Sequence, residues 1–106
     1  MAKKDLLKER IVYKPFEYQE AADYWLKQHQ AHWLHTEVPM MSDITDWSSN
    51  LNKTEKNIIG SILKGFAQTE TVVNDYWSGL VTKWFRKPEV IMMATTFGAF
   101  ETIHAE

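Results

Sequence analysis

Apolar residues recur at spacings of three and four positions in three stretches of the chain, which is the period of an α-helix with one buried face. The first stretch spans residues 17–35, and its repeating positions are Tyr18, Ala22, Trp25, His29 and Trp33. The second spans 53–77, with Ile59, Ile62, Leu63, Phe66, Val73 and Trp77. The third runs from Pro88 to Glu106, with Val90, Met93 and Phe97. This pattern predicts an all-α fold of about three helices.

Helix-start signals precede the second and third stretches. Asn52 and Glu55 form a capping-box pattern before the second helix. Pro88 and Glu89 place a proline at the first helical position and an acid in the first turn, both of which are favoured at a helix start. These signals predict helix starts near residues 53 and 88.

Three stretches lack the helical period: an extended arm at 1–16, a connector at 36–52 and a link at 80–87. Pro39 breaks the helical pattern within the connector. Ser78-Gly79 is expected to stop or kink the second helix, and Gly60 and Gly65 within that helix are expected to permit a close neighbour. We expect one partial domain over residues 1–106, with its helices in 17–106.

Composition excludes several classes of protein. A chain of 106 residues with 44% hydrophobic content is one small domain at most, and its net charge of −2 indicates no nucleic-acid partner. Cysteine is absent, which excludes disulfides and thiolate sites and fits a reducing compartment. The sequence contains neither a signal-peptide pattern nor an apolar stretch of membrane-spanning length. We therefore expect a cytoplasmic protein without a membrane partner.

Three ionisable residues interrupt the apolar stripes. Glu70 falls within the stripe of the second helix, and Glu101 and His104 end the stripe of the third. Glu101 and His104 are three positions apart, so a helix places them on one face. A buried charge is costly unless it is paired or metal-bound, and two carboxylates with an imidazole suit iron or manganese. The alternative is that the carboxylates reach solvent at the rim of the apolar surface or pair with Lys or Arg, and that His104 is a packed histidine. We expect His29, His32 and His35 to be polar or packing histidines.

Several stretches resemble the amino-terminal part of the radical-generating small subunit of class I ribonucleotide reductase. The resemblance lies in residues 31–47 (AHWLHTEVPMMSDITDW), 52–60 (NKTEKNIIG), 63–70 (LKGFAQTE) and 97–104 (FGAFETIH). It implies the amino-terminal part of a ferritin-like helical bundle, which is incomplete alone and houses a dinuclear metal site in a protein that normally forms a homodimer.

The resemblance also implies a role for each candidate residue. Glu70 resembles the carboxylate ligand of the first metal, Glu101 the carboxylate that bridges the two metals, and His104 the histidine on the first metal. Trp33 resembles the tryptophan that relays an electron to the metal site, although helical spacing alone would also explain a core tryptophan there. The implied cofactor is a dinuclear iron centre or a manganese–iron pair.

Other family features are absent from the sequence. The radical-bearing tyrosine would lie four positions after His104, beyond the last residue, Glu106. The remaining metal ligands, the aspartate partner of the tryptophan relay and the carboxy-terminal tail that docks on the large subunit are absent too. We therefore expect a split subunit, in which a complementary carboxy-terminal small-subunit chain completes the site. The alternatives are that two copies pair with each other or that the chain is a truncated product.

The function implied is that of part of the ribonucleoside-diphosphate reductase small subunit, active with its missing half and the large catalytic subunit. It would supply half of the metal site that generates the radical for reduction of ribonucleotides to deoxyribonucleotides. Two alternatives remain open. One is a ferritin-like iron-binding or oxidase protein that completes its site by homodimerisation. The other is a structural interaction fragment whose metal ligands are vestigial.

Overall fold

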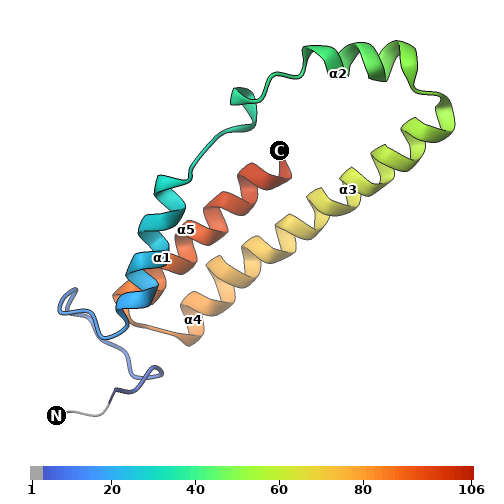
Figure 1. Cartoon of the computed structure of the whole chain (residues 1–106). Helices are drawn as coiled ribbons and strands as arrows, with labels where there is room; N and C mark the ends of the chain where they lie inside the picture. The colour runs from blue at the N-terminus through green and yellow to red at the C-terminus, as the bar shows by residue number, and fades with distance from the viewer. Residues whose placement is uncertain (1–3) are drawn as a thin grey trace.

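The computed structural model describes residues 4–106, and every regular element in that range is helical (Figure 1). The three long helices are α1 (Gln19–Gln30), α3 (Lys53–Asp75) and α5 (Pro88–Ala105). The shorter segments are η1 (His35–Glu37), α2 (Met41–Thr45), η2 (Asp46–Asn50), η3 (Tyr76–Val81) and α4 (Thr82–Trp84). The all-α prediction is confirmed, and the long helices fall in the three stretches with helical periodicity.

The first helix is shorter than the sequence pattern predicts. α1 ends at Gln30, and the chain is no longer helical at His32, Trp33 and Leu34. Leu34 is extended, and its backbone N–H donates to the Glu37 carboxylate to close the single turn of η1. The predicted helix over 17–35 is therefore wrong at its carboxyl end. Trp33 belongs to the connector rather than to a helical stripe.

The second helix starts as predicted, and its α-helical part ends at Asp75, two residues before the predicted end. The Asn52 side chain accepts from the Glu55 N–H at 2.8 Å, and the Glu55 carboxylate accepts from the Asn52 N–H at 3.0 Å, which confirms the capping box. Ser78-Gly79 does not stop the helix. Gly79 does not adopt the left-handed conformation of a helix-ending glycine, and the chain passes through the π-helical turn of η3 into α4.

α3 and α5 lie side by side and run in opposite directions, while α1 packs against α5 (Figure 1). The segment containing α2 and η2 extends away from this group (Figure 1). The chain measures 66 × 23 × 17 Å, and its radius of gyration is 19.2 Å. A compact domain of this length has a radius of about 13 Å. The helices therefore form an elongated, open assembly.

The small core lies where α1, η3 and the first half of α5 meet. Its buried members are Ala21, Val81, Val90 and Ala94, with Trp77, Phe85 and Met93 packed around them. Ala94 has no exposed surface, and Phe97 packs edge-on against Trp77 with ring centroids 4.9 Å apart. The predicted stripe of the third helix therefore does face the core.

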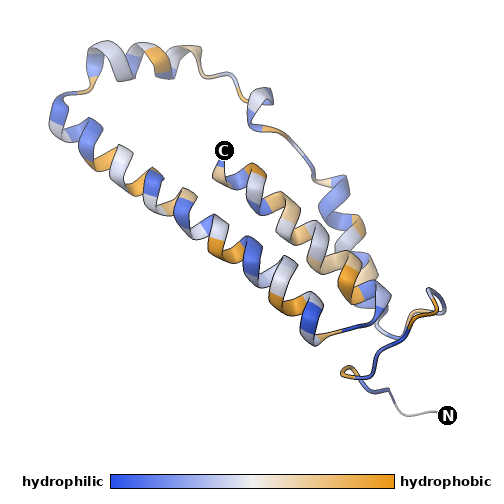
Figure 2. Cartoon of the chain, turned by 180° about the vertical axis from the view of Figure 1, so that it is seen from behind, coloured by the Kyte–Doolittle hydropathy of each residue, from blue (hydrophilic) through white to orange (hydrophobic). Residues whose placement is uncertain are grey.

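The amino-terminal half of the second helix's stripe is left uncovered by the described residues. Its residues Ile59, Ile62, Leu63 and Phe66, here called the α3 apolar face, all retain large exposed surfaces. Phe66 is 62% exposed and Ile62 is 52% exposed. Figure 2 shows apolar residues recurring along α3. Contiguous apolar surface of this kind is typical of an interaction site.

An ion cluster joins the amino-terminal arm to the start of α5, and its members are Arg10, Glu17, Lys87 and Glu89. The Arg10 guanidinium binds the Glu89 carboxylate and also Glu17, at 3.0 Å. Lys87 Nζ lies 3.1 Å from Glu17. Glu89 and Lys87 are both buried, so this ion cluster pairs charges that would be costly to bury alone.

Candidate metal centre

Two helices bring together the three ionisable residues that interrupt the apolar stripes. Glu70 lies near the carboxyl end of α3, and Glu101 and His104 lie in the last turns of α5. One ligand atom from each residue lies within 4.8 Å of the other two. This spacing follows from the antiparallel packing of α3 on α5, because Glu101 and His104 share the α5 face that meets α3.

The distances are those of a preformed polar cluster. His104 Nδ1 lies 3.1 Å from Glu101 Oε2 and 3.9 Å from Glu70 Oε2. The Glu101 side chain is 16% exposed, that of Glu70 is 27% exposed and that of His104 is 53% exposed. The carboxylates are thus partly sheltered, while the imidazole lies on the open side. Nδ1 is the His104 nitrogen that faces both acids.

Within the part of the chain that the structure describes, His104 is the basic residue that pairs with the two carboxylates. Across residues 4–106, no Lys or Arg forms an ion pair with Glu70 or Glu101. Hydrogen bonding with Glu101 raises the pKa of Glu70, and partial burial and the negative charge of Glu101 raise it further, whereas His104 lowers it. The alternative in which these carboxylates pair with Lys or Arg is therefore wrong within the described residues.

This donor set fits a hard to borderline divalent cation. Carboxylate oxygens suit manganese and iron, imidazole nitrogen suits iron, and a cation would relieve the repulsion between the two acids. Three donors leave coordination positions to be filled by other groups. The three described donors could therefore contribute to holding one metal ion, but they do not close a dinuclear site.

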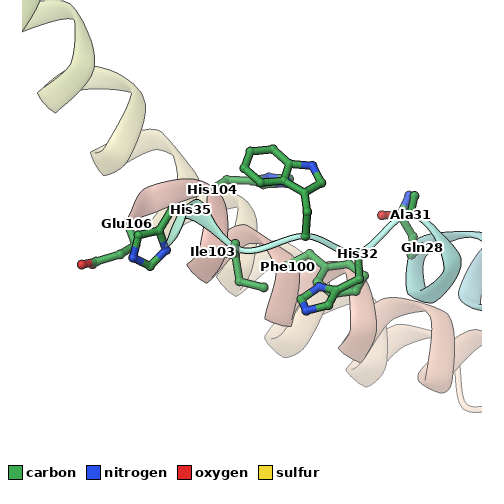
Figure 3. A pocket seen from close by; sticks show the side chains of 9 residues that line it. Gln28, Ala31, His32, His35, Phe100, Ile103, His104 and Glu106 are labelled. Carbon is green, nitrogen blue, oxygen red and sulfur yellow. The ribbon is translucent and has the colours of Figure 1, made fainter. Parts of the chain in front are cut away.

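Trp33 lies near this cluster although it is not on a helix. Trp33 and His104 both line a cavity of about 330 Å³ between the end of α1, the connector and the end of α5. Figure 3 shows the side chains around this cavity: Phe100, Ile103 and His104 come from α5, and His32 and His35 come from the segment that follows α1. Trp33 is 56% exposed, so it is not the core tryptophan that helical spacing would suggest.

The histidines of the first stretch make packing contacts with α5. His29 Nε2 lies 3.3 Å from Thr96 Oγ1, and the His29 ring meets Phe100 edge-on. His32 stacks on the same Phe100 ring, with centroids 5.3 Å apart. His29 and His32 therefore have the packing role expected from the sequence, and they join α1 to the helix that carries Glu101 and His104.

The family described as "Ribonucleotide reductase, small chain" matches residues 10–106. The chain belongs to the ribonucleotide reductase small-chain family. This finding confirms the resemblance seen in the sequence. Together with the helices described above, it identifies an amino-terminal part of a ferritin-like bundle.

Individual members of the ribonucleotide reductase small-chain family align with almost all of the chain. The "Probable ribonucleoside-diphosphate reductase small subunit 376L" of Invertebrate iridescent virus 6 is 37% identical over 95% of this chain and 28% of its own length. The "Probable ribonucleoside-diphosphate reductase small subunit 048L" of Invertebrate iridescent virus 3 is 38% identical over 93% of this chain and 26% of its own length. The "Ribonucleoside-diphosphate reductase small chain 1" of Saccharomyces cerevisiae is 28% identical over 93% of this chain and 25% of its own length. The chain thus spans about a quarter of the length of these relatives.

Two features of this small-chain family member have no signal in its sequence. Arg10 and Glu89 pair across the fold, and no local motif links residues so far apart. Gly98 lies at a close contact between helices, and a single glycine within an apolar helix does not reveal such a contact.

In residues 4–106, no helix combines the length and the apolar character needed to cross a membrane.

Proposed function

We propose that this chain forms part of the small subunit of a ribonucleoside-diphosphate reductase and supplies half of its dinuclear metal site. The observation that supports this most directly is the convergence of Glu70, Glu101 and His104, whose ligand atoms lie within 4.8 Å of one another. Family membership supports the same conclusion. The metals are proposed to be an iron pair or a manganese–iron pair, in keeping with the oxygen and imidazole donors.

Each residue has a proposed role. Glu70 and His104 would be terminal ligands of one metal, and Glu101 would share its carboxylate between two. Such a metal pair supplies, when bound, the oxidising chemistry that generates the protein radical used in ribonucleotide reduction. Trp33 would carry an electron toward the site, because it borders the cavity that His104 also lines.

The partners are proposed on the basis of exposed surface and missing ligands. The α3 apolar face is uncovered, and three ligands cannot enclose two metals. A chain carrying the remaining small-subunit helices would cover this face and add the other ligands; a second copy is the competing arrangement. The large catalytic subunit would receive the radical. A cytoplasmic location is proposed because the sequence has no cysteine.

Metal binding tests the proposal. The full chain would be mixed with Mn(II), alone and together with the carboxy-terminal part of the small subunit of Invertebrate iridescent virus 6, to which it is 37% identical. We expect weak binding by the chain alone and a coupled two-metal signal in electron paramagnetic resonance with the complement. A two-metal signal from a homodimer without complement would favour the ferritin-like alternative. Absence of binding in both samples would overturn the proposal.

A pair of variants makes the test specific to the site. Glu101→Ala should abolish the two-metal signal, because it removes the carboxylate that would be shared by both metals. Glu20→Gln, on an exposed position of α1, should leave the signal unchanged. Formation of deoxyribonucleoside diphosphate by the complemented assembly with a large subunit would then test the reductase activity. Retention of the two-metal signal in Glu101→Ala would contradict the bridging role.

A further inference from the structure

α5 approaches the preceding helical run closely at Gly98, one turn before Glu101, the first proposed metal ligand of α5. A Cβ atom added to Gly98 would lie 2.0 Å from Ser78 Oγ, 3.2 Å from Ser78 Cβ and 3.3 Å from Asn74 Oδ1. The Ser78 hydroxyl is exposed and can rotate away, but the other two contacts stay tighter than ordinary van der Waals contact. The absence of a side chain therefore sets how closely the helices approach.

The residues that face Gly98 continue the row that carries Glu70. Glu70, Asn74 and Ser78 are spaced four apart on one face of the helical run, and the Ser78 hydroxyl donates to Asn74 Oδ1 at 2.9 Å. On α5, Glu101 follows Gly98 by three positions, about 4.5 Å along the axis. The same helix interface therefore contains two adjacent contacts: Gly98 lies against Asn74 and Ser78, and one helical turn further along α5, Glu101 lies near Glu70.

We propose that Gly98 is a positioning residue for the metal centre. Its missing Cβ brings α5 close enough to α3 for Glu101 and His104 to reach a metal held by Glu70. This inference rests on the proposed metal-binding function. Ala94, one turn earlier, has no exposed surface and fixes that part of α5 in the core. A methyl group at Gly98 would therefore displace mainly the end of the helix that carries the ligands.

Gly65 provides a matched control within the same chain. It too lies inside a long helix, but a Cβ added there meets nothing within 4 Å in the described structure. The expectation that Gly60 and Gly65 admit a close neighbour is not met within residues 4–106, because an added Cβ at Gly60 reaches only Trp47 there, at 4.0 Å. Gly98→Ala and Gly65→Ala add the same methyl group, the first at a crowded position and the second at an open one.

The experiment measures Mn(II) affinity of the complemented assembly from free Mn(II) in electron paramagnetic resonance, normalised to helical content from circular dichroism. Gly98→Ala should weaken binding about 10-fold, the scale typical of changes that misorient a ligand. Gly65→Ala should leave the affinity unchanged. Gly98→Ala combined with Ser78→Gly removes the two nearest atoms, Oγ and Cβ of Ser78, and should recover most of the loss, whereas Ser78→Gly alone should bind as the wild type does.

Each outcome decides a separate point. Wild-type affinity in a folded Gly98→Ala variant would overturn the positioning role while leaving the proposed function intact. Failure of the double variant to recover binding would also overturn it, because the loss would then not arise from the Ser78 contact. Failure of the wild type to bind Mn(II) would contradict the proposed function itself. A nuclear Overhauser effect between Gly98 Hα and Ser78 Hβ in the metal-free protein tests the close approach independently of metal.

Discussion

Arg10 and Glu89 lie 79 positions apart in the sequence, yet the Arg10 guanidinium donates to both oxygens of the Glu89 carboxylate, which has no exposed surface. The same carboxylate accepts from the backbone N–H groups of Glu17, at 3.0 Å, and Tyr18, at 3.2 Å. One buried acid thus joins the arm, the start of α1 and the start of α5. Glu101 is twelve residues further along α5, about 18 Å away, so the contact organises the helices rather than the metal site.

Removal of Arg10 is therefore expected to destabilise the fold. Arg10→Met keeps much of the side-chain volume but leaves Glu89 buried without its cation, which typically costs about 3–5 kcal/mol. Arg86→Met is the matched control, because Arg86 and Glu9 form an exposed pair at 3.9 Å and such pairs contribute about 0–1 kcal/mol. Urea denaturation followed by circular dichroism measures both. Equal losses in the two variants would contradict a special role for the buried contact.

The same carboxylate predicts an acid-sensitive fold. Burial alone would raise the pKa of Glu89, but hydrogen bonds from Arg10 and from backbone N–H groups lower it to about 2, from 4.5. Because the folded pKa is depressed, the stabilisation is complete above pH about 4.5 and is lost as the pH falls toward 2, with a span of about 3 kcal/mol. Hydrogen bonds from Lys87 and Arg10 lower the pKa of Glu17 and act in the same direction.

Urea denaturation at a series of pH values between 2 and 6 checks this prediction. Wild-type stability should fall steeply on acidification, and Glu89→Gln should be less stable at pH 6 but show a shallower fall. The comparison isolates Glu89 from the other acids that titrate in this range. Parallel pH profiles for the two proteins would rule out Glu89 as the source of the acid sensitivity.

The sequence predicts the helices and the candidate metal ligands better than the contacts between helices. Periodicity locates the three long helices, and Glu70 and Glu101 stand out because each is a carboxylate within an apolar stripe. Periodicity misplaces Trp33, because apolar spacing continues past the end of α1, where the backbone turns into the connector. The pairing of Arg10 with Glu89 depends on which surfaces meet in three dimensions, and no local pattern encodes it.

Sequence patterns predict structure well where only residues close in the sequence interact, and the capping box at the start of α3 can be tested in this respect. Asn52→Ala removes the side-chain acceptor of the Glu55 N–H and should cost about 1 kcal/mol. Asn57→Ala, at an exposed position inside the same helix, should instead stabilise it by about 0.5 kcal/mol through helix propensity. The same chemical change thus has opposite signs five residues apart. Thermal unfolding measures both, and a shift of the same sign in both would contradict the capping assignment.

Glu70 links stability to the proposed metal site. The nearby Glu101 raises the pKa of Glu70, so the ionised pair opposes folding once the pH exceeds the Glu70 pKa. Glu70→Gln should therefore leave the metal-free chain as stable as the wild type or more stable at neutral pH. Mn(II) should stabilise the wild type, by about 2.7 kcal/mol when the metal concentration is 100 times the Kd, and should have little effect on the variant.

The check on Glu70 is urea denaturation of both proteins at neutral pH, with chelator and with Mn(II). Glu20→Gln serves as the control and should respond to Mn(II) as the wild type does, since its side chain is exposed on α1. A loss of stability in metal-free Glu70→Gln would indicate that Glu70 supports the fold directly. Higher stability of Glu70→Gln in chelator, together with loss of its stabilisation by Mn(II), is expected if the Glu70 charge opposes folding and serves metal binding.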